Sequence, residues 1–156
     1  MKLELKHLVG YLPYELKGIS KEEYLGIETI KGFSTYGRQS AINIITTIDD
    51  IDMELFKPIL RPLSDLVKEI EVNGDKFVPI EYFEIGDDNN YSIDFGNGNT
   101  NLIKDLESIS KHKSTFDIQF LPKIISDKLI EWHFDIYGLI EAGLAISIHD
   151  ITQADA

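Results

Sequence analysis

The chain has 156 residues, no cysteine and a formal net charge of −12, from 27 acidic and 15 basic side chains. Without cysteine, disulfides, zinc–thiolate sites, iron–sulfur clusters and thiol nucleophiles are excluded. The negative charge disfavours direct binding to nucleic acid or to an anionic membrane, because like charges repel. The length fits one domain that buries a core of its own.

The negative charge is concentrated in the middle of the chain. Residues 51–110 carry 13 acidic and 5 basic side chains, whereas residues 1–50 carry 7 and 6. Solubility is the simplest interpretation of such an acidic surface. The alternatives are a basic protein partner and mimicry of a nucleic acid towards that partner.

We expect neither a leader segment nor a membrane anchor at the start of this sequence. The stretch MKLELKHLVGYLPYEL is interrupted by charges and lacks the apolar centre of a signal peptide. The longest apolar runs fall far below the roughly 20 residues that span a bilayer. We therefore expect a cytoplasmic protein.

The N-terminal third is predicted to contain one helix and then strands. Leucines and Val9 at helical spacing predict a short helix over residues 3–12, ended by Pro13. Residues 14–48 are rich in Ile, Thr, Tyr and Gly, which predicts three short strands in an antiparallel meander or a small barrel. Turns are expected at residues 20–22 and 36–39.

The middle of the chain is predicted to alternate between short helices and extended segments. Asp50 or Asp52 is expected to cap a helix that stops near Pro58. Pro62 then opens a second helix, whose buried stripe is expected to comprise Leu63, Leu66, Val67 and Ile70. Asn73-Gly74 is a strong turn signal that leads into KFVPIEYF, which is expected to be extended at least as far as Pro79.

The last third is predicted to be mainly helical. In residues 86–101, Tyr91, Ile93 and Phe95 alternate as in a strand. Thr100 or Asn101 is expected to cap the helix LIKDLESISKH. Apolar residues recur every three or four positions from Leu121 to Ile140, which predicts a long core helix over 122–142 that stops at Gly143. LAISI is expected to form a closing strand, and the tail ITQADA to be loose.

Glu131, His133 and Asp135 alternate around the only tryptophan, Trp132, and raise the question of a catalytic or metal-binding triad. On a helix, Glu131 and Asp135 would share a face and His133 would point roughly 160–200° away. The long helix therefore argues against a triad. It predicts a buried Trp132, a structural His133 and a solvated face for both carboxylates.

Two other segments have a functional and a structural interpretation. Asp50, Asp52 and Glu54 could gather around Mg²⁺ or Ca²⁺ through oxygen ligands, or could cap the helix that follows. FKPILRPLSDL, with Lys57 and Arg61, could form a recognition edge or a rigid connection. The sequence contains no nucleophile elbow, phosphate-binding loop or dinucleotide fingerprint. We therefore assign no catalytic, cofactor-binding or metal-binding residue and no cofactor.

Three stretches together support a resemblance: LELKHLVGYLPYELK, FKPILRPLSDLVKEIEVNGDKFVPIEYF and LIEWHFDIYGLIEAGLAISI. They resemble a family of small uncharacterised proteins encoded in phage and prophage regions of gut-type bacteria. The resemblance covers residues 2–17, 55–83 and 121–148. It implies a phage setting and the cytoplasm of a bacterial host cell, but no activity, cofactor or catalytic residue.

The sequence therefore predicts an α+β fold with an N-terminal antiparallel β meander or small barrel and C-terminal helices packed on it. We expect a single domain over 1–156, with a β-rich portion at 14–50, a mainly helical portion with short strands at 51–148 and a loose tail at 149–156. The leading hypothesis is a non-catalytic, phage-derived interaction protein that binds a host or phage protein, in a narrower form as a host-defence inhibitor. Its acidic surface should involve Glu84, Asp87 and Asp88. The alternatives are a small-ligand binding or sequestering protein and a metal-dependent hydrolase.

Overall fold

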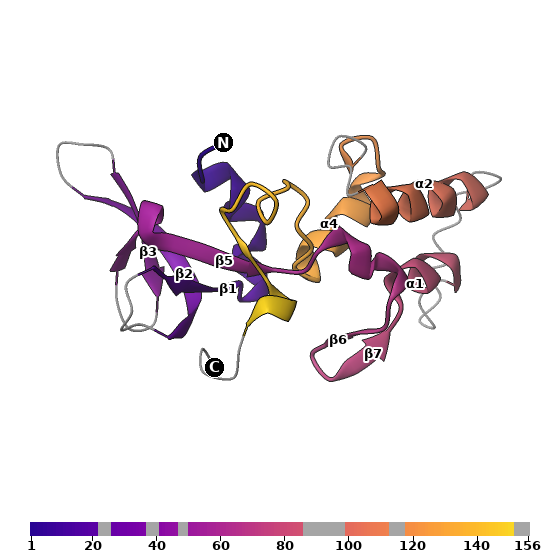
Figure 1. Ribbon diagram of the computed structural model, residues 1–156, viewed down its shortest axis with the longest axis horizontal. Coiled ribbons are helices and arrows are strands. Elements are labelled where there is room, and N and C mark those ends of the chain that lie inside the picture. The colour runs from indigo at the N-terminus through magenta and orange to yellow at the C-terminus, as the bar shows by residue number, and fades with distance from the viewer. Residues whose placement is uncertain (22–25, 37–40, 47–49, 86–98, 113–117, 152–156) are drawn as a thin grey trace. The chain divides into compact units, whose positions relative to one another are not determined.

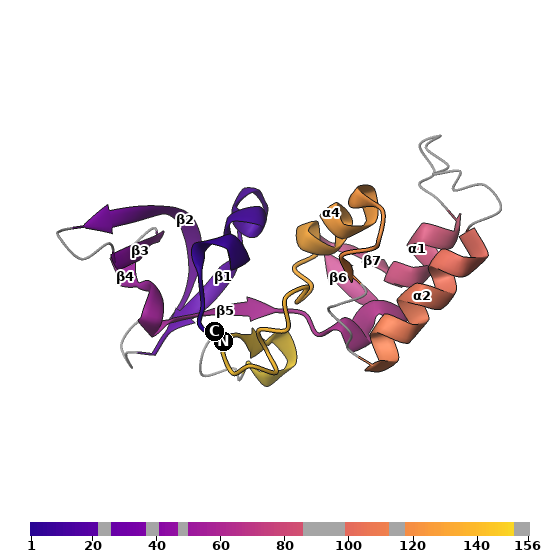
Figure 2. The same ribbon diagram turned by 90° about the horizontal axis from the view of Figure 1, so that it is seen from above.

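The computed structural model (Figures 1 and 2) describes residues 1–21, 26–36, 41–46, 50–85, 99–112 and 118–151. The chain forms two compact units. Unit 1 comprises Met1–Arg61 and Leu129–Ala156, and unit 2 comprises Pro62–Lys128. The chain therefore leaves unit 1 after Arg61 and returns to it at Leu129. None of the helices in the described ranges is long and apolar enough to cross a membrane.

Unit 1 is built on a six-stranded, mostly antiparallel sheet in the order β4-β3-β2-β1-β5-β8 (Figure 1). The strands are β1 (Lys17–Ser20), β2 (Ile27–Tyr36), β3 (Ala41–Thr46), β4 (Asp50–Asp52), β5 (Phe56–Leu60) and β8 (Ile146–Ser147). The α+β class and the meander β1–β2–β3 are confirmed. Within the described ranges the sheet is open, with β4 and β8 at its edges, so it is not a closed barrel. The packing of helices on the meander stays a prediction.

One face of this sheet carries the core of unit 1. Residues two apart in a strand share a face, so Gly18 lies on the same face as Leu16 and opposite Glu28 and Pro58 of the neighbouring strands. The most buried members of the core cluster are Leu8, Tyr11, Leu16, Ile30, Ile44, Phe56, Leu60 and Leu139. They come from both ends of the chain as well as from the strands.

The N-terminal helix differs from its prediction. It consists of two 3₁₀ helices, η1 (Leu5–His7) and η2 (Val9–Tyr14), and Pro13 lies inside η2 rather than ending it. A helix this short has few internal N–H bonds to lose at a proline. The turn ends at Glu15, which takes a left-handed conformation with φ of 56°.

The segment after β4 was only partly predicted. Asp52 caps the 3₁₀ helix η3 (Met53–Leu55) as expected, through a 2.9 Å bond from the Glu54 N–H. The helix does not continue to Pro58, because FKPIL is strand β5. In the described structure β8 pairs only with Ile59 and Leu60. The nitrogen of Pro58, which carries no hydrogen, can therefore face away from β1 without losing a hydrogen bond of the ladder.

Unit 2 combines a β hairpin with helices. After Pro62 come η4 (Leu63–Val67), β6 (Ile70–Val72), β7 (Asp75–Phe77), α1 (Pro79–Ile85), α2 (Asn99–His112) and the first part of α4 (Lys123–Glu131). The predicted turn is confirmed, since Asn73 and Gly74 have φ of 52° and 89°. α1 and α2 lie side by side (Figure 2).

Two details of the unit 2 helices were wrong. Val67 was assigned to a buried stripe but is 47% exposed, whereas Leu63, Leu66 and Ile70 are buried. The prediction assumed the spacing of an α-helix. This 3₁₀ helix is short and more tightly wound, so its side chains do not line up in the same buried stripe. α2 begins at Asn99, so Thr100 and Asn101 lie inside it rather than capping it.

The predicted long helix 122–142 is also wrong. α4 ends at Glu131, and the chain as far as Ala145 consists of turns and bends with one bridge, from Phe134 to Arg61. His133, Gly138 and Gly143 all have positive φ, which interrupts right-handed helical geometry. Gly143 therefore lies in one of these turns and does not mark the end of a helix. The closing strand is confirmed as β8, parallel to β5, and a short 3₁₀ helix, η6 (Ile148–Asp150), follows it.

Some predictions fall on parts of the chain outside the described residues. These are the turn at 36–39 beyond Tyr36, the alternating strand of Tyr91, Ile93 and Phe95, and the end of the tail from residue 152. Asp87 and Asp88 belong to the same group, and so does the side chain of Glu84.

Candidate functional site

The helix ends before the EWHFD segment is complete, so the structure answers the triad question differently from the helical argument. His133 has φ of 62°, and its Nε2 lies 2.7 Å from the carbonyl oxygen of Tyr14. The Nε2–H donates to that carbonyl. Asp135 was expected on a solvated face but is buried, and its carboxylate accepts from the backbone N–H groups of Leu139 and Ile140 at 2.9 and 2.8 Å. Trp132 is buried as predicted.

The same segment is held against the N-terminal 3₁₀ helices. The Tyr11 hydroxyl donates to the Phe134 carbonyl at 2.6 Å, and burial raises the pKa of Tyr11. The His7 ring lies 5.2 Å from that of Tyr137, and its Nδ1 accepts the backbone N–H of Glu4 at 3.0 Å. These polar groups bind the backbone of their own unit. Their arrangement stabilises the fold and does not direct a nucleophile or base at a common point.

Both histidines of this region make stability dependent on pH. Burial lowers the pKa of His133 and of His7 below the usual value. The folded state therefore binds fewer protons than the unfolded state just below pH 6.5, and the stability that each histidine contributes is complete above that pH and is lost as the pH falls.

We expect the free energy of unfolding to decrease from pH 7 to pH 5 more steeply in the wild type than in His133→Asn. Asparagine tolerates the left-handed conformation and does not titrate in this range. Urea denaturation at both pH values measures the difference. Parallel losses in the two proteins would contradict the assignment for His133.

The acidic segment before β5 shows capping and ion pairing rather than convergence. Asp52 binds the Glu54 N–H, and the Glu54 carboxylate pairs with Lys2 at 2.6 Å. Within the described ranges no three His, Asp or Glu side chains gather closely enough to hold a metal ion. The positions of Asp50, Asp52 and Glu54 therefore do not support the hypothesis of a metal-dependent hydrolase.

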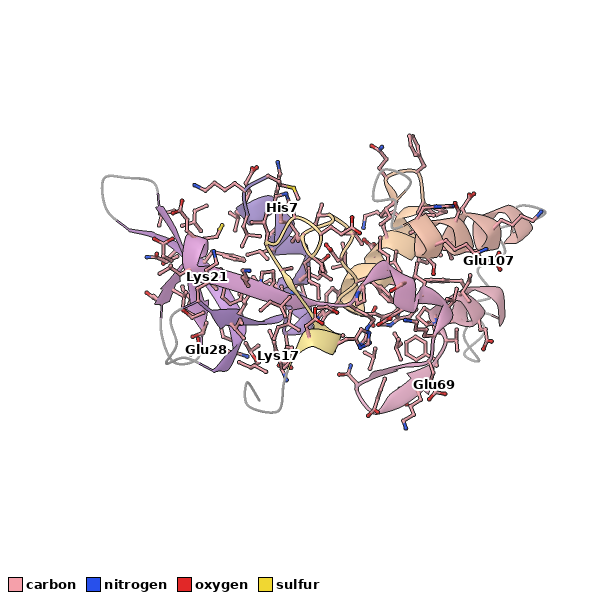
Figure 3. The ribbon with its side chains drawn as sticks, in the orientation of Figure 1. His7, Lys17, Lys21, Glu28, Glu69 and Glu107 are labelled. Carbon is pink, nitrogen blue, oxygen red and sulfur yellow. The ribbon has the colours of Figure 1, made fainter. Side chains whose placement is uncertain are left out.

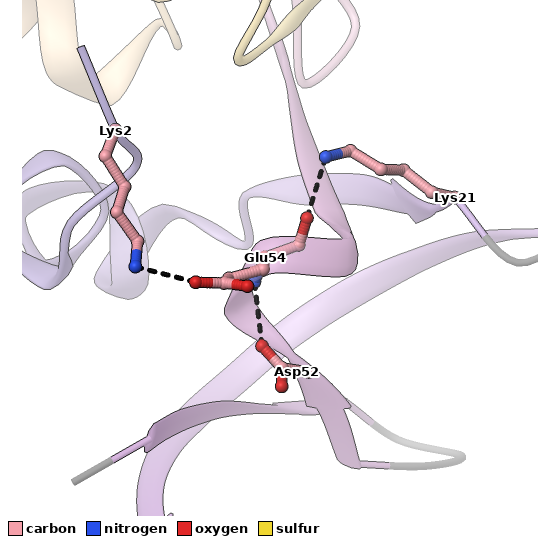
Figure 4. A network of polar contacts seen from close by, with 4 residues as sticks. All are labelled: Lys2, Lys21, Asp52 and Glu54. Atoms are coloured by element: carbon pink, nitrogen blue, oxygen red, sulfur yellow. Dashed lines mark hydrogen bonds and ion pairs between the residues drawn. The ribbon is translucent and has the colours of Figure 1, made fainter. Parts of the chain in front are cut away.

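Glu54, whose polar contacts are drawn in Figure 4, lines a hollow of about 370 Å³ in unit 1. We call its more buried lining the floor, which comprises Leu3, Met53, Phe56 and Leu144. We call its exposed lining the rim, which comprises Met1, Lys2, Lys21 and Glu54. Lys21 Nζ donates to the Glu54 carbonyl at 2.7 Å, so Glu54 holds both lysine ammonium groups at the rim.

Sequence reasoning missed this hollow. Its lining comes from four separated stretches of the chain, and neither Lys2 nor Lys21 stands in a motif. Only the acidic residues Asp52 and Glu54 gave a local signal, and that signal suggested a metal. The hollow lies between η3 and the first residues of the chain, which the ion pair between Lys2 and Glu54 joins.

A second buried carboxylate was also missed. Glu28 lies on β2 (Figure 3) and is 4% exposed. Both of its carboxylate oxygens lack a hydrogen-bond partner among the described residues. Glu28 and Ile30 are two residues apart in the strand and therefore share a face. This spacing could have predicted that Glu28 lies on the core face. It lies opposite Gly18, so no side chain of that cross-strand neighbour can bind it.

Lys57 and Arg61 were considered as a recognition edge. Arg61 instead joins the turn after α4, where its Nε donates to the Trp132 carbonyl at 3.4 Å and its guanidinium lies 6.0 Å from the Phe134 ring centroid. Its backbone also bonds to His133 and Asp135. The division between the units follows directly after it, which fits the connecting interpretation.

Unit 2 presents acidic and apolar groups to solvent. Glu69 near the hairpin and Glu107 on α2 are both exposed (Figure 3). Phe120 is 71% exposed, and Ile124, four residues later, is 47% exposed. A hollow of about 190 Å³ lies beside Phe120 and is lined also by Asp105, Ser108 and Leu121.

Comparison with known proteins gave no match: no family model, no curated protein and no solved structure is similar to this chain at a significant level.

Proposed function

We propose that this chain is a non-catalytic interaction protein of phage origin that binds a host or phage protein in the cytoplasm of a bacterial cell. In its narrower form it inhibits a host-defence factor. The observation that carries the proposal is the exposure of Phe120 beside the hollow of unit 2. The phage setting rests on the resemblance of the three sequence stretches given above.

Phe120 has the properties of a residue that a partner covers. A large aromatic ring exposed to water forgoes the free energy that its burial would give. Aromatic side chains contribute strongly to the centres of protein interfaces. Ile124 enlarges the apolar surface, and the hollow next to Phe120 offers space for a side chain of the partner.

Charge supports a basic partner. Unit 2 carries 13 acidic and 7 basic side chains, and exposed Asp105 lines the same hollow as Phe120. An acidic surface attracts a basic protein and speeds its association at low salt. The polar groups that could have suggested catalysis, in Tyr11, His133 and Asp135, bind backbone atoms instead.

The test compares the immobilised wild-type chain with Phe120→Ser in lysate of a phage-host bacterium, read by quantitative mass spectrometry. We expect a protein that the wild type retains to be depleted about ten-fold or more by Phe120→Ser, since aromatic anchors cost about 2 kcal/mol or more when truncated. Retention should also fall as salt is raised.

Val9→Ser is the matched control, because Val9 is a similarly exposed apolar residue of unit 1, at 52%. It should retain the partner as the wild type does. If Phe120→Ser and Val9→Ser retain the same proteins in the same amounts, Phe120 is not the contact and the proposal loses its main support.

A second candidate function is binding of a small ligand in unit 1. The observation that favours it is the hollow of about 370 Å³ between the N-terminal residues and η3. Its volume lies within the roughly 300–1,000 Å³ typical of small-molecule sites. The chemistry of its lining restricts the ligand further.

A further inference from the structure

We infer that the hollow of unit 1 binds an amphipathic carboxylate, with the carboxylate at Lys2 and Lys21 and a short aliphatic tail over the floor. This inference deepens the second candidate function, on which it rests, and names the class of ligand. It does not depend on the protein partner proposed for unit 2.

The floor fits an aliphatic chain. Leu3, Met53 and Phe56 are each at most 6% exposed, and they offer the hollow apolar atoms without a charged group among them. Burial of an aliphatic tail against such a surface is favourable in proportion to the area removed from water. Met53 adds a flexible thioether chain that can adapt to tails of different shape.

The rim fits an anionic head group. Both lysines are exposed, and each has one partner among the described residues: the Glu54 carboxylate for Lys2 at 2.6 Å and the Glu54 carbonyl for Lys21 at 2.7 Å. An ammonium group has three N–H donors, so each lysine keeps donors for the oxygens of a ligand. The hydrogen bond to Glu54 raises the pKa of Lys2, which keeps this ammonium charged.

The side chains that line the rim carry one positive charge in excess, and the carboxylates of Asp52 and Glu4 act on Lys2 from outside the lining. Its charged side chains are Lys2, Lys21 and Glu54, two positive and one negative. Asp52 lies next to Glu54, and its Oδ1 accepts the Glu54 N–H (Figure 4). The Glu54 carboxylate is paired with Lys2, whereas Lys21 binds a neutral carbonyl, so the charge of Lys21 is not balanced within the rim and can take a carboxylate in a charge-assisted hydrogen bond.

The experiment titrates the ¹⁵N-labelled full chain with octanoate, octylammonium and octanol below their micelle or solubility limits. These probes share a tail and differ in the charge of the head group. We expect octanoate to bind most tightly and to shift the amide signals of Leu3, Met53 and Phe56. Lys2→Gln and Lys21→Gln should each weaken octanoate about five- to ten-fold without changing octanol, because a charge-assisted bond is lost and the floor is intact.

Lys31→Gln is the control, since Lys31 is an exposed lysine of β2 outside the hollow. It should leave octanoate affinity within two-fold of the wild type. All three substitutions change exposed side chains, so the folded spectrum should persist and loss of binding should not come from unfolding.

Three outcomes overturn the inference. If octylammonium binds as tightly as octanoate, the ligand class is wrong while ligand binding in unit 1 stands. If Lys2→Gln and Lys21→Gln bind octanoate as the wild type does, the head group does not contact the rim. If no probe shifts the signals of the floor, the second candidate function falls together with the inference.

Discussion

Replacing Trp132 with alanine is expected to lower the free energy of unfolding by about 3–5 kcal/mol, the range for truncation of a buried aromatic side chain. The indole is 4% exposed, although Trp132 lies just beyond the end of α4. Its backbone carbonyl also accepts the Arg61 side chain. Truncation would leave a cavity at the point where the chain turns from α4 into the 133–145 segment, and neighbouring side chains could fill it only in part.

Urea denaturation measures the effect. It is followed by far-ultraviolet circular dichroism because the substitution removes the only tryptophan, and with it the usual fluorescence signal. Phe120→Ala serves as the control, because Phe120 is 71% exposed and its truncation should change stability by less than about 1 kcal/mol. Near-equal losses in the two variants would show that Trp132 is not a core residue. The same control tests whether the unit 2 surface can be altered without unfolding the chain.

The features that the sequence predicted correctly have local causes. Asn73-Gly74 forms its turn because both residues tolerate positive φ, and Asp52 caps η3 because its carboxylate reaches an N–H two residues away. The composition of residues 14–48, rich in Ile, Thr, Tyr and Gly, was enough for the meander because each strand pairs with the next one along the chain. In each case the determining partners are close in sequence.

The features that were missed depend on partners far along the chain. Residues 132–145 keep apolar spacing suited to a helix, but the Asp135 carboxylate takes the N–H groups of Leu139 and Ile140, and Phe134 pairs with Arg61. β5 is buried on both faces, so FKPIL shows no alternation that would mark it as a strand. The hollow of unit 1 combines residues 1–3, 21, 53–56 and 144. No window of sequence contains this information.

Gly18→Ala is expected to destabilise the chain by about 3 kcal/mol or more, at the upper end of what overpacking of a core costs. A Cβ at this position would lie 2.0 Å from Cζ of Phe56 and 2.7 Å from the Lys57 carbonyl oxygen. The Phe56 ring is 1% exposed and has little space to move, and the carbonyl belongs to β5, which pairs with β1 at Gly18. Relief therefore requires a shift of the strand pair on which the sheet of unit 1 is built.

Gly26→Ala is the matched control, since a Cβ there meets nothing within 4 Å. It should leave stability unchanged or slightly higher, because alanine restricts the unfolded chain. Trp132 fluorescence can follow unfolding in both variants. A double-mutant cycle with Phe56→Leu isolates the contact: the smaller side chain removes the ring clash but not the one with the Lys57 carbonyl, so Gly18→Ala should cost less in that background while remaining destabilising. Additive effects of the two substitutions would mean that the Phe56 ring does not lie over Gly18, and the floor of the hollow, which Phe56 helps to form, would then have to be redrawn.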